Sequence, residues 1–174
     1  MAKSDSFFIR AKVENQTGTY IETEIDLGSF VNLGVTKSTL LRIHRCQVQW
    51  ADNTAVDNAI YSLVGGGAKI AYQVTTQPQA DLVLADDKSL ICSGSLQMFG
   101  DPNATAHAVG MSEHADINVA EYTAGYLVGV DSIYLSTASS GTITSGGVDC
   151  AIVLECTLET ATQASSTALA LSQQ

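Results

Sequence analysis

The sequence predicts an all-β fold: an antiparallel two-sheet jelly-roll sandwich or barrel of eight or nine strands. Three observations support this prediction. Apolar and polar residues alternate with a period of two through most of residues 7–158, turn residues recur at intervals of about 10 to 20 residues, and no long amphipathic helix is evident. Antiparallel sandwiches are typical of this pattern, whereas parallel sheets alternate strands with helices.

The first two strands follow directly from the alternation. Residues 7–13 are apolar at every second position, and a turn separates them from a second strand over residues 20–27. The outer face of this second strand carries Glu22, Glu24 and Asp26. A row of three like charges predicts that this face lies opposite cations or in open water.

A longer strand is expected over residues 40–50. Its apolar residues occupy odd positions up to Ile43 and even positions from Cys46, so the pattern changes across His44 and Arg45. One extra residue there, a β-bulge, keeps both apolar runs on one face. We therefore expect a bent strand in the middle of a sheet, at a place where two sheets share a core or a barrel turns a corner.

The remaining strands are expected in the second and third parts of the chain. They span residues 69–76, 90–98, 122–138 with a break at Asp131 and Ser132, and 148–158, and a short apolar piece at 60–64 precedes three glycines. Alternation disappears from 101 to about 120. We expect this segment to be the longest loop and the one best placed to touch a partner or ligand.

The length is that of one domain, which we place at residues 1–160 as a single β jelly roll. Residues 161–174 form a low-complexity C-terminal tail that should be mobile if alone, so we expect an assembly contact to hold it. No apolar run approaches the roughly 20 residues of a membrane span, and the N-terminal residues lack the apolar stretch of a signal peptide. We expect neither an anchor nor a signal peptide.

Charge is scarce and unevenly distributed. Charged residues make up 15% of the chain, which indicates that part of its surface is covered, most often by copies of itself. The net charge is −10, every Lys and Arg lies at or before Lys88, and the residues after it hold eight acids. A nucleic-acid surface needs several cations in one patch, so direct nucleic-acid binding is not expected.

The four cysteines all fall on predicted inward faces. They occupy positions 46, 92, 150 and 156. Cys150 and Cys156 lie on one face of one strand about 20 Å apart, which is too far for a disulfide. Without any C-x-x-C spacing, we expect four buried thiols in a protein that folds in a reducing cytoplasm.

No motif indicates catalysis, so we expect no enzyme activity, no cofactor, and no catalytic, cofactor-binding or metal site. His107, Glu113, His114 and Asp116 are conceivable metal ligands, but they lack the H-E-x-x-H and His-x-His spacings, and a solvated loop is favoured. Residues 65–69 superficially resemble a phosphate-binding loop. They lack the Ser or Thr after Lys and precede a predicted strand, which favours a simple turn.

The only basic cluster consists of Lys37, Arg42, His44 and Arg45. We expect Arg42 and His44 to point one way and Arg45 the other, so that the bulge divides the cluster between two faces. Ion pairs with the acidic row at 22–26, in a neighbouring strand or subunit, are favoured over a nucleic-acid patch.

Two segments carry a resemblance to a known group. Residues 24–30, EIDLGSF, lead into 38–44, STLLRIH, and the strand pattern that follows ends in a long strand and a small-residue tail. This arrangement resembles the small single jelly-roll major capsid proteins of tailless icosahedral, membrane-containing viruses of archaea and bacteria. The resemblance covers the first third of the chain in sequence and the rest in pattern.

The resemblance implies a structural protein: a self-assembling, homo-oligomeric subunit of a virion capsid, synthesised in the host cytoplasm. Its implied partners are copies of itself in capsomers, and it further suggests a second capsid protein and an internal membrane. The absence of a basic arm agrees with a shell that encloses a membrane rather than bare genome.

Two other functions remain open. A jelly-roll carbohydrate- or receptor-binding module would show exposed aromatic residues at one loop end, whereas Trp50 and most tyrosines fall within predicted strands. A phage tail-tube or decoration protein is also all-β and self-assembling. Ring size and symmetry in electron micrographs would distinguish such a protein from a shell subunit.

Overall fold

A computed structural model gives the fold of most of the chain. It describes residues 5–15, 18–33, 37–61, 67–100, 108–140, 143 and 147–173.

Nine strands and two short helices are described in this part of the chain. They are β1 (Phe7–Asn15), β2 (Ile21–Asp26), β3 (Lys37–Asp52), β4 (Ala68–Thr75), β5 (Leu90–Gly100), β6 (Ala108–Ile117), the 3-10 helix η1 (Val119–Glu121), β7 (Tyr126–Val128), β8 (Ser132–Ser140), β9 (Val148–Thr162) and the helix α1 (Gln163–Ser172).

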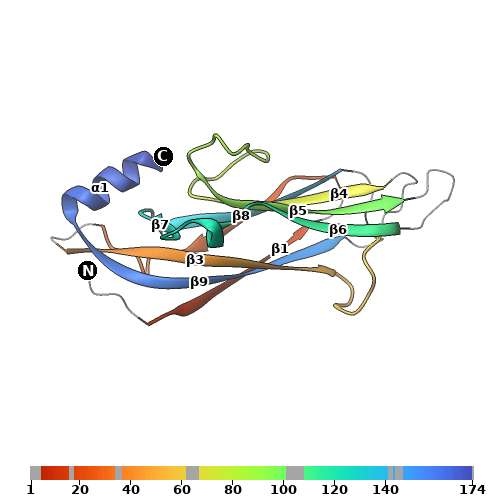
Figure 1. Cartoon of the computed structure of the whole chain (residues 1–174), viewed down its shortest axis with the longest axis horizontal. Coiled ribbons are helices and arrows are strands. Elements are labelled where there is room, and N and C mark those ends of the chain that lie inside the picture. Colours follow the sequence, from red (N-terminus) through yellow and green to blue (C-terminus); the bar gives the residue numbers. More distant parts are fainter. Residues whose placement is uncertain are drawn as a thin grey trace.

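The strands form two antiparallel sheets that face each other. Sheet A has the order β1-β9-β3-β7 and sheet B the order β2-β8-β4-β5-β6. Figure 1 shows the two layers along the long axis of the molecule. Without β6, each sheet has four strands, and successive strands alternate between the sheets except for β4 and β5, which are neighbours in sheet B, as in a jelly roll. The predicted fold class and strand number are confirmed.

The predicted bulge in the long strand is confirmed. The register between β3 and β9 shifts between Ile43 and Arg45. Before the shift, Leu41 and Ile43 are fully buried, and after it Cys46 and Trp50 pack against the same core. β3 lies between β9 and β7, in the interior of sheet A, so both halves of this bent strand contribute to the core shared by the sheets.

The cysteines are free thiols inside the sandwich, as expected. Cys92, Cys150 and Cys156 are buried and Cys46 is partly buried. A hydrogen bond with Cys46, together with burial, raises the pKa of Cys92, and burial raises the pKa of Cys156 to about 12. Thiols held so firmly in the neutral form behave as small apolar side chains.

β6 corrects the prediction of a long loop over residues 101–120. Residues 108–117 form an edge strand that pairs with β5, while 101–107 lie outside the described residues. Most β6 side chains from Met111 to Asp116 are exposed, including neighbours that point to opposite faces. An edge strand with little burial on either face has no apolar alternation to reveal it, and the prediction therefore failed here.

The break predicted within residues 122–138 separates two sheets. β7 belongs to sheet A and β8 to sheet B. The core therefore receives Val128 from one layer and Ile133 and Leu135 from the other. The short apolar piece predicted at 60–64 falls mostly on residues 62–66, which lie outside the described part of the chain.

The C-terminal tail is folded. β9 continues to Thr162, two residues beyond the expected domain boundary. The side chain of Thr162 caps α1 by accepting a hydrogen bond from the Ser165 amide. α1 turns back along one end of the sandwich (Figure 1). Among the described residues, no helix combines the length and apolar content that crossing a membrane requires.

Candidate functional site

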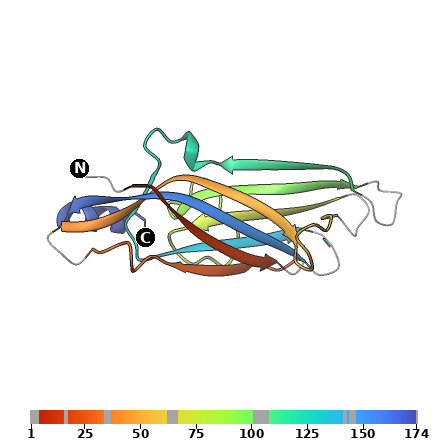
Figure 2. The ribbon, with the colours of Figure 1, turned by 90° about the horizontal axis from the view of Figure 1, so that it is seen from below.

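The outer face of sheet A has two stretches, separated by the bulge in β3. Figure 2 shows β9 between β1 and β3 on this side of the molecule. The first stretch lies near α1 and contains the outward residues Ser38, Leu40, Arg42 and Glu159. We call it the covered stretch. The second contains the outward residues of β1, of β9 from Asp149 to Glu155, and of β3 after the bulge, and we call it the open stretch.

A buried ion pair lies in the covered stretch. Arg42 Nε and Nη2 each donate to one carboxylate oxygen of Glu159 at 2.7 Å, and Arg42 Nη1 donates to the Ala124 carbonyl oxygen at 2.7 Å. The side chain of Glu159 is only 3% exposed. The hydrogen bonds to Glu159 raise the pKa of Arg42, and the paired geometry offsets the cost of burying both charges.

Gln173, the last but one residue of the sequence, is held by residues in or directly after β7 of sheet A and β4 of sheet B. Its side-chain amide donates to the Leu127 carbonyl oxygen at 2.6 Å and accepts from the Gly129 amide at 2.8 Å. Its backbone carbonyl oxygen accepts from Thr76 Oγ1 at 2.7 Å and from Gln77 Nε2 at 3.3 Å. The tail is therefore held by contacts within its own subunit.

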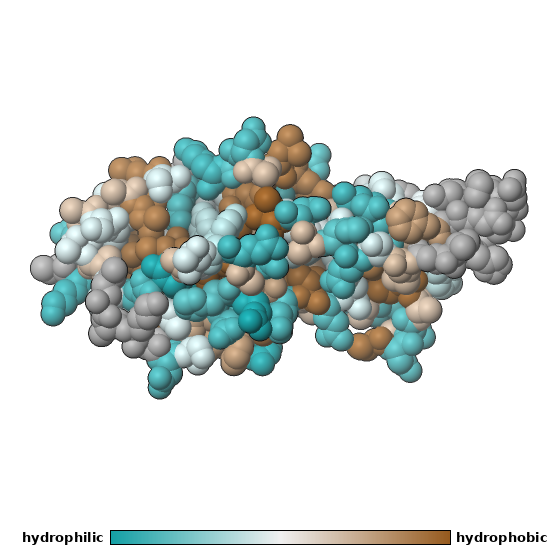
Figure 3. Space-filling model, viewed as in Figure 1, coloured by the Kyte–Doolittle hydropathy of each residue, from teal (hydrophilic) through white to brown (hydrophobic). Residues whose placement is uncertain are grey.

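The body of α1 makes close contacts but leaves space on both sides. Ser166 Oγ donates to Ser38 Oγ at 2.8 Å, and a Cβ placed on Gly129 would lie 2.9 Å from the Leu169 side chain. Cavities of about 440 Å³ and 480 Å³ flank the helix. Apolar side chains gather over this end of the molecule (Figure 3), and Leu171 is 66% exposed.

The open stretch contains a shallow groove. Its cross-strand rows place Phe8 and Arg45 beside Glu155, and Arg10 and Gln47 beside Val153. The groove has a volume of about 250 Å³ and is lined by Phe8, Arg45, Gln47, Val153 and Glu155. The Arg10 guanidinium lies 5.8 Å from the centre of the Phe8 ring, and Phe8 is 54% exposed. We call this the arginine groove.

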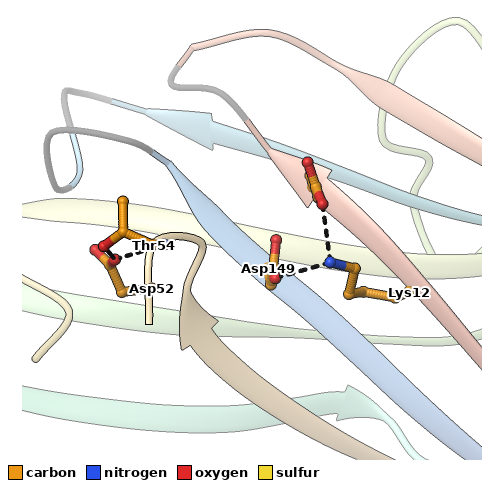
Figure 4. A network of polar contacts seen from close by, with 5 residues as sticks. Lys12, Asp52, Thr54 and Asp149 are labelled. Atoms are coloured by element: carbon orange, nitrogen blue, oxygen red, sulfur yellow. Dashed lines mark hydrogen bonds and ion pairs between the residues drawn. The ribbon is translucent and has the colours of Figure 1, made fainter. Parts of the chain in front are cut away.

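Lys12 ends the open stretch with a small charge network. Its Nζ lies 2.8 Å from Glu14 Oε1 and 3.0 Å from Asp149 Oδ2 (Figure 4). Hydrogen bonds to these two carboxylates raise the pKa of Lys12. Figure 4 also shows Asp52, whose carboxylate accepts from the amide and hydroxyl of Thr54 at the end of β3. Lys12 thus already has partners, unlike the two arginines of the groove, for which the described residues provide no ion pair.

The basic cluster does not have the predicted orientation. Arg42 bonds to Glu159, His44 Nε2 lies 2.9 Å from Thr157 Oγ1, and Arg45 lies beside Glu155 in the groove. These three β9 residues are two apart and share the outer face. The predicted separation of Arg42 and His44 from Arg45 was wrong, because the bulge shifts the outward set together with the inward set and so keeps these three side chains on one face.

The acidic row of β2 lies on the outer face of sheet B, away from this cluster. Its cross-strand neighbours on β8 are Ser136, Tyr134 and Ser132, none of them a cation. Glu22 accepts from the Tyr20 hydroxyl and the Gln79 amide, and Glu24 accepts from the Ser132 hydroxyl. Burial, then Glu24, Glu22 and Asp131, raise the pKa of Tyr134. Glu22, Glu24, Asp26 and Asp131 therefore form an acidic patch.

The residues considered above as conceivable metal ligands do not form a site in the described part of the chain. Glu113 and His114 are neighbours on β6 and point to opposite faces, His114 lies 2.8 Å from Ser112 Oγ, and His107 falls outside the described residues. Over the described ranges, no group of three or more His, Cys, Asp or Glu residues is placed to hold a metal ion. Lys69 lies in β4, paired with Gln97, so a strand follows the glycines as expected.

Sequence reasoning missed the arginine groove. The signal was a large apolar residue, Phe8, at an outward position next to Arg10 in the first predicted strand. It was overlooked because a single exposed apolar residue is common on protein surfaces. The pairing of β1 and β3 with β9, which brings Arg45 to the same place, could not be read from local alternation.

No protein-family model matches the chain, and no curated protein matches it. Among solved structures, VP1 of Human Polyomavirus 12, in complex with 3'-sialyllactosamine, aligns with 91% of this chain and 100% of its own at a TM-score of 0.52 and 8% identity. The fold resembles that of the viral capsid protein VP1. The VP1 of Trichodysplasia spinulosa-associated polyomavirus, in complex with GM1 oligosaccharide, covers 89% of this chain and 94% of its own, with a TM-score of 0.48 and 10% identity.

VP1 of New Jersey Polyomavirus gives a TM-score of 0.46 at 8% identity, with 90% of this chain and 98% of that chain covered. The match to VP1 of Human Polyomavirus 12, at 8% identity, supports a shared fold and nothing further. Function has to be argued from the surfaces, because one fold serves many functions.

Proposed function

We propose that this protein is a self-assembling structural subunit of a virus capsid. The observation that carries the proposal is a single jelly roll that aligns over nearly its whole length with a viral capsid protein. Its two outer faces add support, because one presents Phe8 with two arginines and the other an acidic patch. Exposed aromatic and arginine side chains are enriched at protein interfaces.

The finer proposal is a major capsid protein of a tailless icosahedral virus with an internal membrane, infecting archaea or bacteria. It rests on the resemblance of residues 24–30 and 38–44 to that group. The net charge of −10 and the lack of any cation after Lys88 fit a shell that does not neutralise packaged genome. The virion would then be its location, and capsomers its first level of assembly.

The tail belongs to this proposal as a contact surface. α1 is fixed to its own subunit by Gln173, yet Leu171 is exposed and open cavities flank the helix. A neighbouring subunit that packs over this end would bury apolar groups that the subunit itself leaves in water.

The test is the state of association of the purified full-length chain. We expect light scattering to detect oligomers whose mass grows with protein concentration, and electron microscopy to show closed rings or shells. A chain that stays monomeric at high concentration, in low and high salt and with divalent metals, would contradict the proposal. A strong hit on a glycan array by such a monomer would favour a carbohydrate-binding module instead.

A further inference from the structure

The two charged surfaces lie on opposite faces of the sandwich. The arginine groove is on the outer face of sheet A, and the acidic patch is on the outer face of sheet B. They cannot meet within one subunit, because the two layers and the core separate them. They can meet only between two copies of the chain.

Electrostatics limits how copies of this chain can associate. Each copy carries a net charge of −10, so two copies repel each other unless a cationic surface of one meets an acidic surface of the other. Lys12 and Arg42 are already in ion pairs. Of the other described cations, Lys37, Lys69 and Lys88 lie apart from one another, whereas Arg10 and Arg45 lie on the same face of sheet A, one on each side of β9.

The groove has the chemistry of an interface centre. The Arg10 guanidinium lies over the Phe8 ring, and Arg45 lies on the other side of β9, beside Glu155, so longer side chains border the shallow floor at Val153. Two guanidinium groups against the single carboxylate of Glu155 leave this surface positive. Residues that dominate binding at protein interfaces are typically aromatic side chains and arginines that lose their water in such a groove.

The acidic patch has the matching chemistry. Its carboxylates on β2 are two residues apart, about 7 Å at strand rise, and they have no cation across the strand pair. Planar guanidinium groups bind carboxylates with two parallel hydrogen bonds, so two arginines can engage two of these side chains at once. Tyr134 in the same patch offers an aromatic surface for Phe8.

We infer that the arginine groove of one copy binds the acidic patch of the next copy, in a head-to-tail contact that repeats around a ring. The contact joins two different surfaces, so each copy keeps one free groove and one free patch until the ring closes. A two-fold dimer does not occupy both the groove and the patch of each copy, because the two surfaces lie on opposite faces of the sandwich. This inference rests on the proposed function, and it names the surfaces through which the capsid subunits meet.

Reciprocal charge reversal tests the contact. One variant is Arg10→Glu with Arg45→Glu, and the other is Glu24→Arg with Asp131→Arg. In the first variant both contact surfaces are acidic. In the second, two of the four carboxylates of the patch become arginines, which removes the net negative charge that the groove arginines would meet. Neither variant should therefore associate with itself. Mixed together, each reversed surface meets a complementary one, and we expect association to return in complexes of equal stoichiometry.

The controls reverse equal numbers of charges elsewhere. Lys37→Glu with Lys88→Glu matches the first variant, and Asp57→Arg with Asp86→Arg matches the second; all four residues are exposed and outside both surfaces. The control variants should associate as the unmodified chain does. Circular dichroism and a melting curve establish that each variant is folded.

The outcomes separate this inference from the proposed function. If the unmodified chain assembles and the groove and patch variants assemble equally well, the contact is wrong and the capsid proposal stands. If both variants stay monomeric alone and when mixed, the pairing of these two surfaces is wrong. If the unmodified chain never assembles, the capsid proposal fails and the contact fails with it.

Discussion

The covered and open stretches of sheet A share the strands β3 and β9, but their charged side chains differ in burial. In the covered stretch, Arg42 and Glu159 are buried together under the C-terminal end of the chain. In the open stretch, Arg10 and Arg45 remain exposed beside Phe8. The difference lies in the partners: Arg42 is paired with a buried carboxylate and a carbonyl oxygen of its own chain, whereas Arg10 and Arg45 have no ion pair among the described residues.

The largest loss of stability is expected from a substitution in the covered stretch. Arg42→Ala removes both guanidinium hydrogen bonds from a carboxylate that is 3% exposed, which should lower the free energy of unfolding by about 3 to 5 kcal/mol. Denaturant titration at low protein concentration measures it. Arg45→Ala in the open stretch is the matched control, with a change within about 0.5 kcal/mol. Equal losses in both variants would remove the distinction between the stretches.

The stability of the core behind both stretches should fall at alkaline pH. The folded pKa values of Cys92, Cys150 and Cys156 are raised above 9.0, so these thiols stabilise the fold below that pH and the contribution is lost as pH rises above it. As the pH rises by one unit centred on 9.0, the three thiols together should lower the free energy of unfolding by about 2 kcal/mol, because they ionise in the unfolded chain and stay neutral in the folded one.

Denaturation midpoints measured across that range test the pH effect. Replacing Cys156 with Ala should reduce the slope by about a third while also lowering stability at every pH. A midpoint that stays constant up to pH values well above 9.0 would show that the thiols ionise as freely in the folded chain as in the unfolded one.

A smaller loss of stability is expected at Gln173, which holds the C-terminal tail against the sandwich. Gln173→Ala removes two side-chain hydrogen bonds to the backbone of residues 127 and 129, one of them from a buried amide, and should cost about 1 to 3 kcal/mol. Hydrogen exchange should then speed up in α1 while the core strands remain protected. Leu171→Ala, which changes an exposed side chain of the same helix, should leave exchange unchanged.

The smallest effect on folding is expected at Phe8. Its ring is 54% exposed, so Phe8→Ala should change stability by only about 0.5 kcal/mol or less. The same substitution should weaken self-association by roughly tenfold or more, as removal of an interface anchor does. Sedimentation at several concentrations measures the association, and unchanged association would show that the groove does not lie in a contact.

The interior of the molecule was predictable from alternation because burial imposes it. Leu41, Ile43, Cys46 and Trp50 reported the bulge correctly, since only one face of β3 meets the core. β6 was missed because neither of its faces is well buried. The tail was expected to lack its own structure, and its helix depends on hydrogen bonds from Gln173 and Ser166 to strands far away in sequence.

The functional surfaces were predictable only in part for the same reason. The acidic row of β2 was identified from its spacing, which is a local property. The neighbours of Arg42 and Arg45 come from β9, more than 100 residues later, so no local pattern could assign one to an ion pair and the other to a groove.

The central position of β9 has a consequence for biosynthesis. β1 and β3 are not hydrogen-bonded to each other; β9 lies between them and pairs with both. The floor of the groove, Val153 and Glu155, thus comes from a strand more than 100 residues after Arg45. Under the contact proposed above, a polypeptide that stops before β9 would lack the groove and could not join a neighbouring subunit through it.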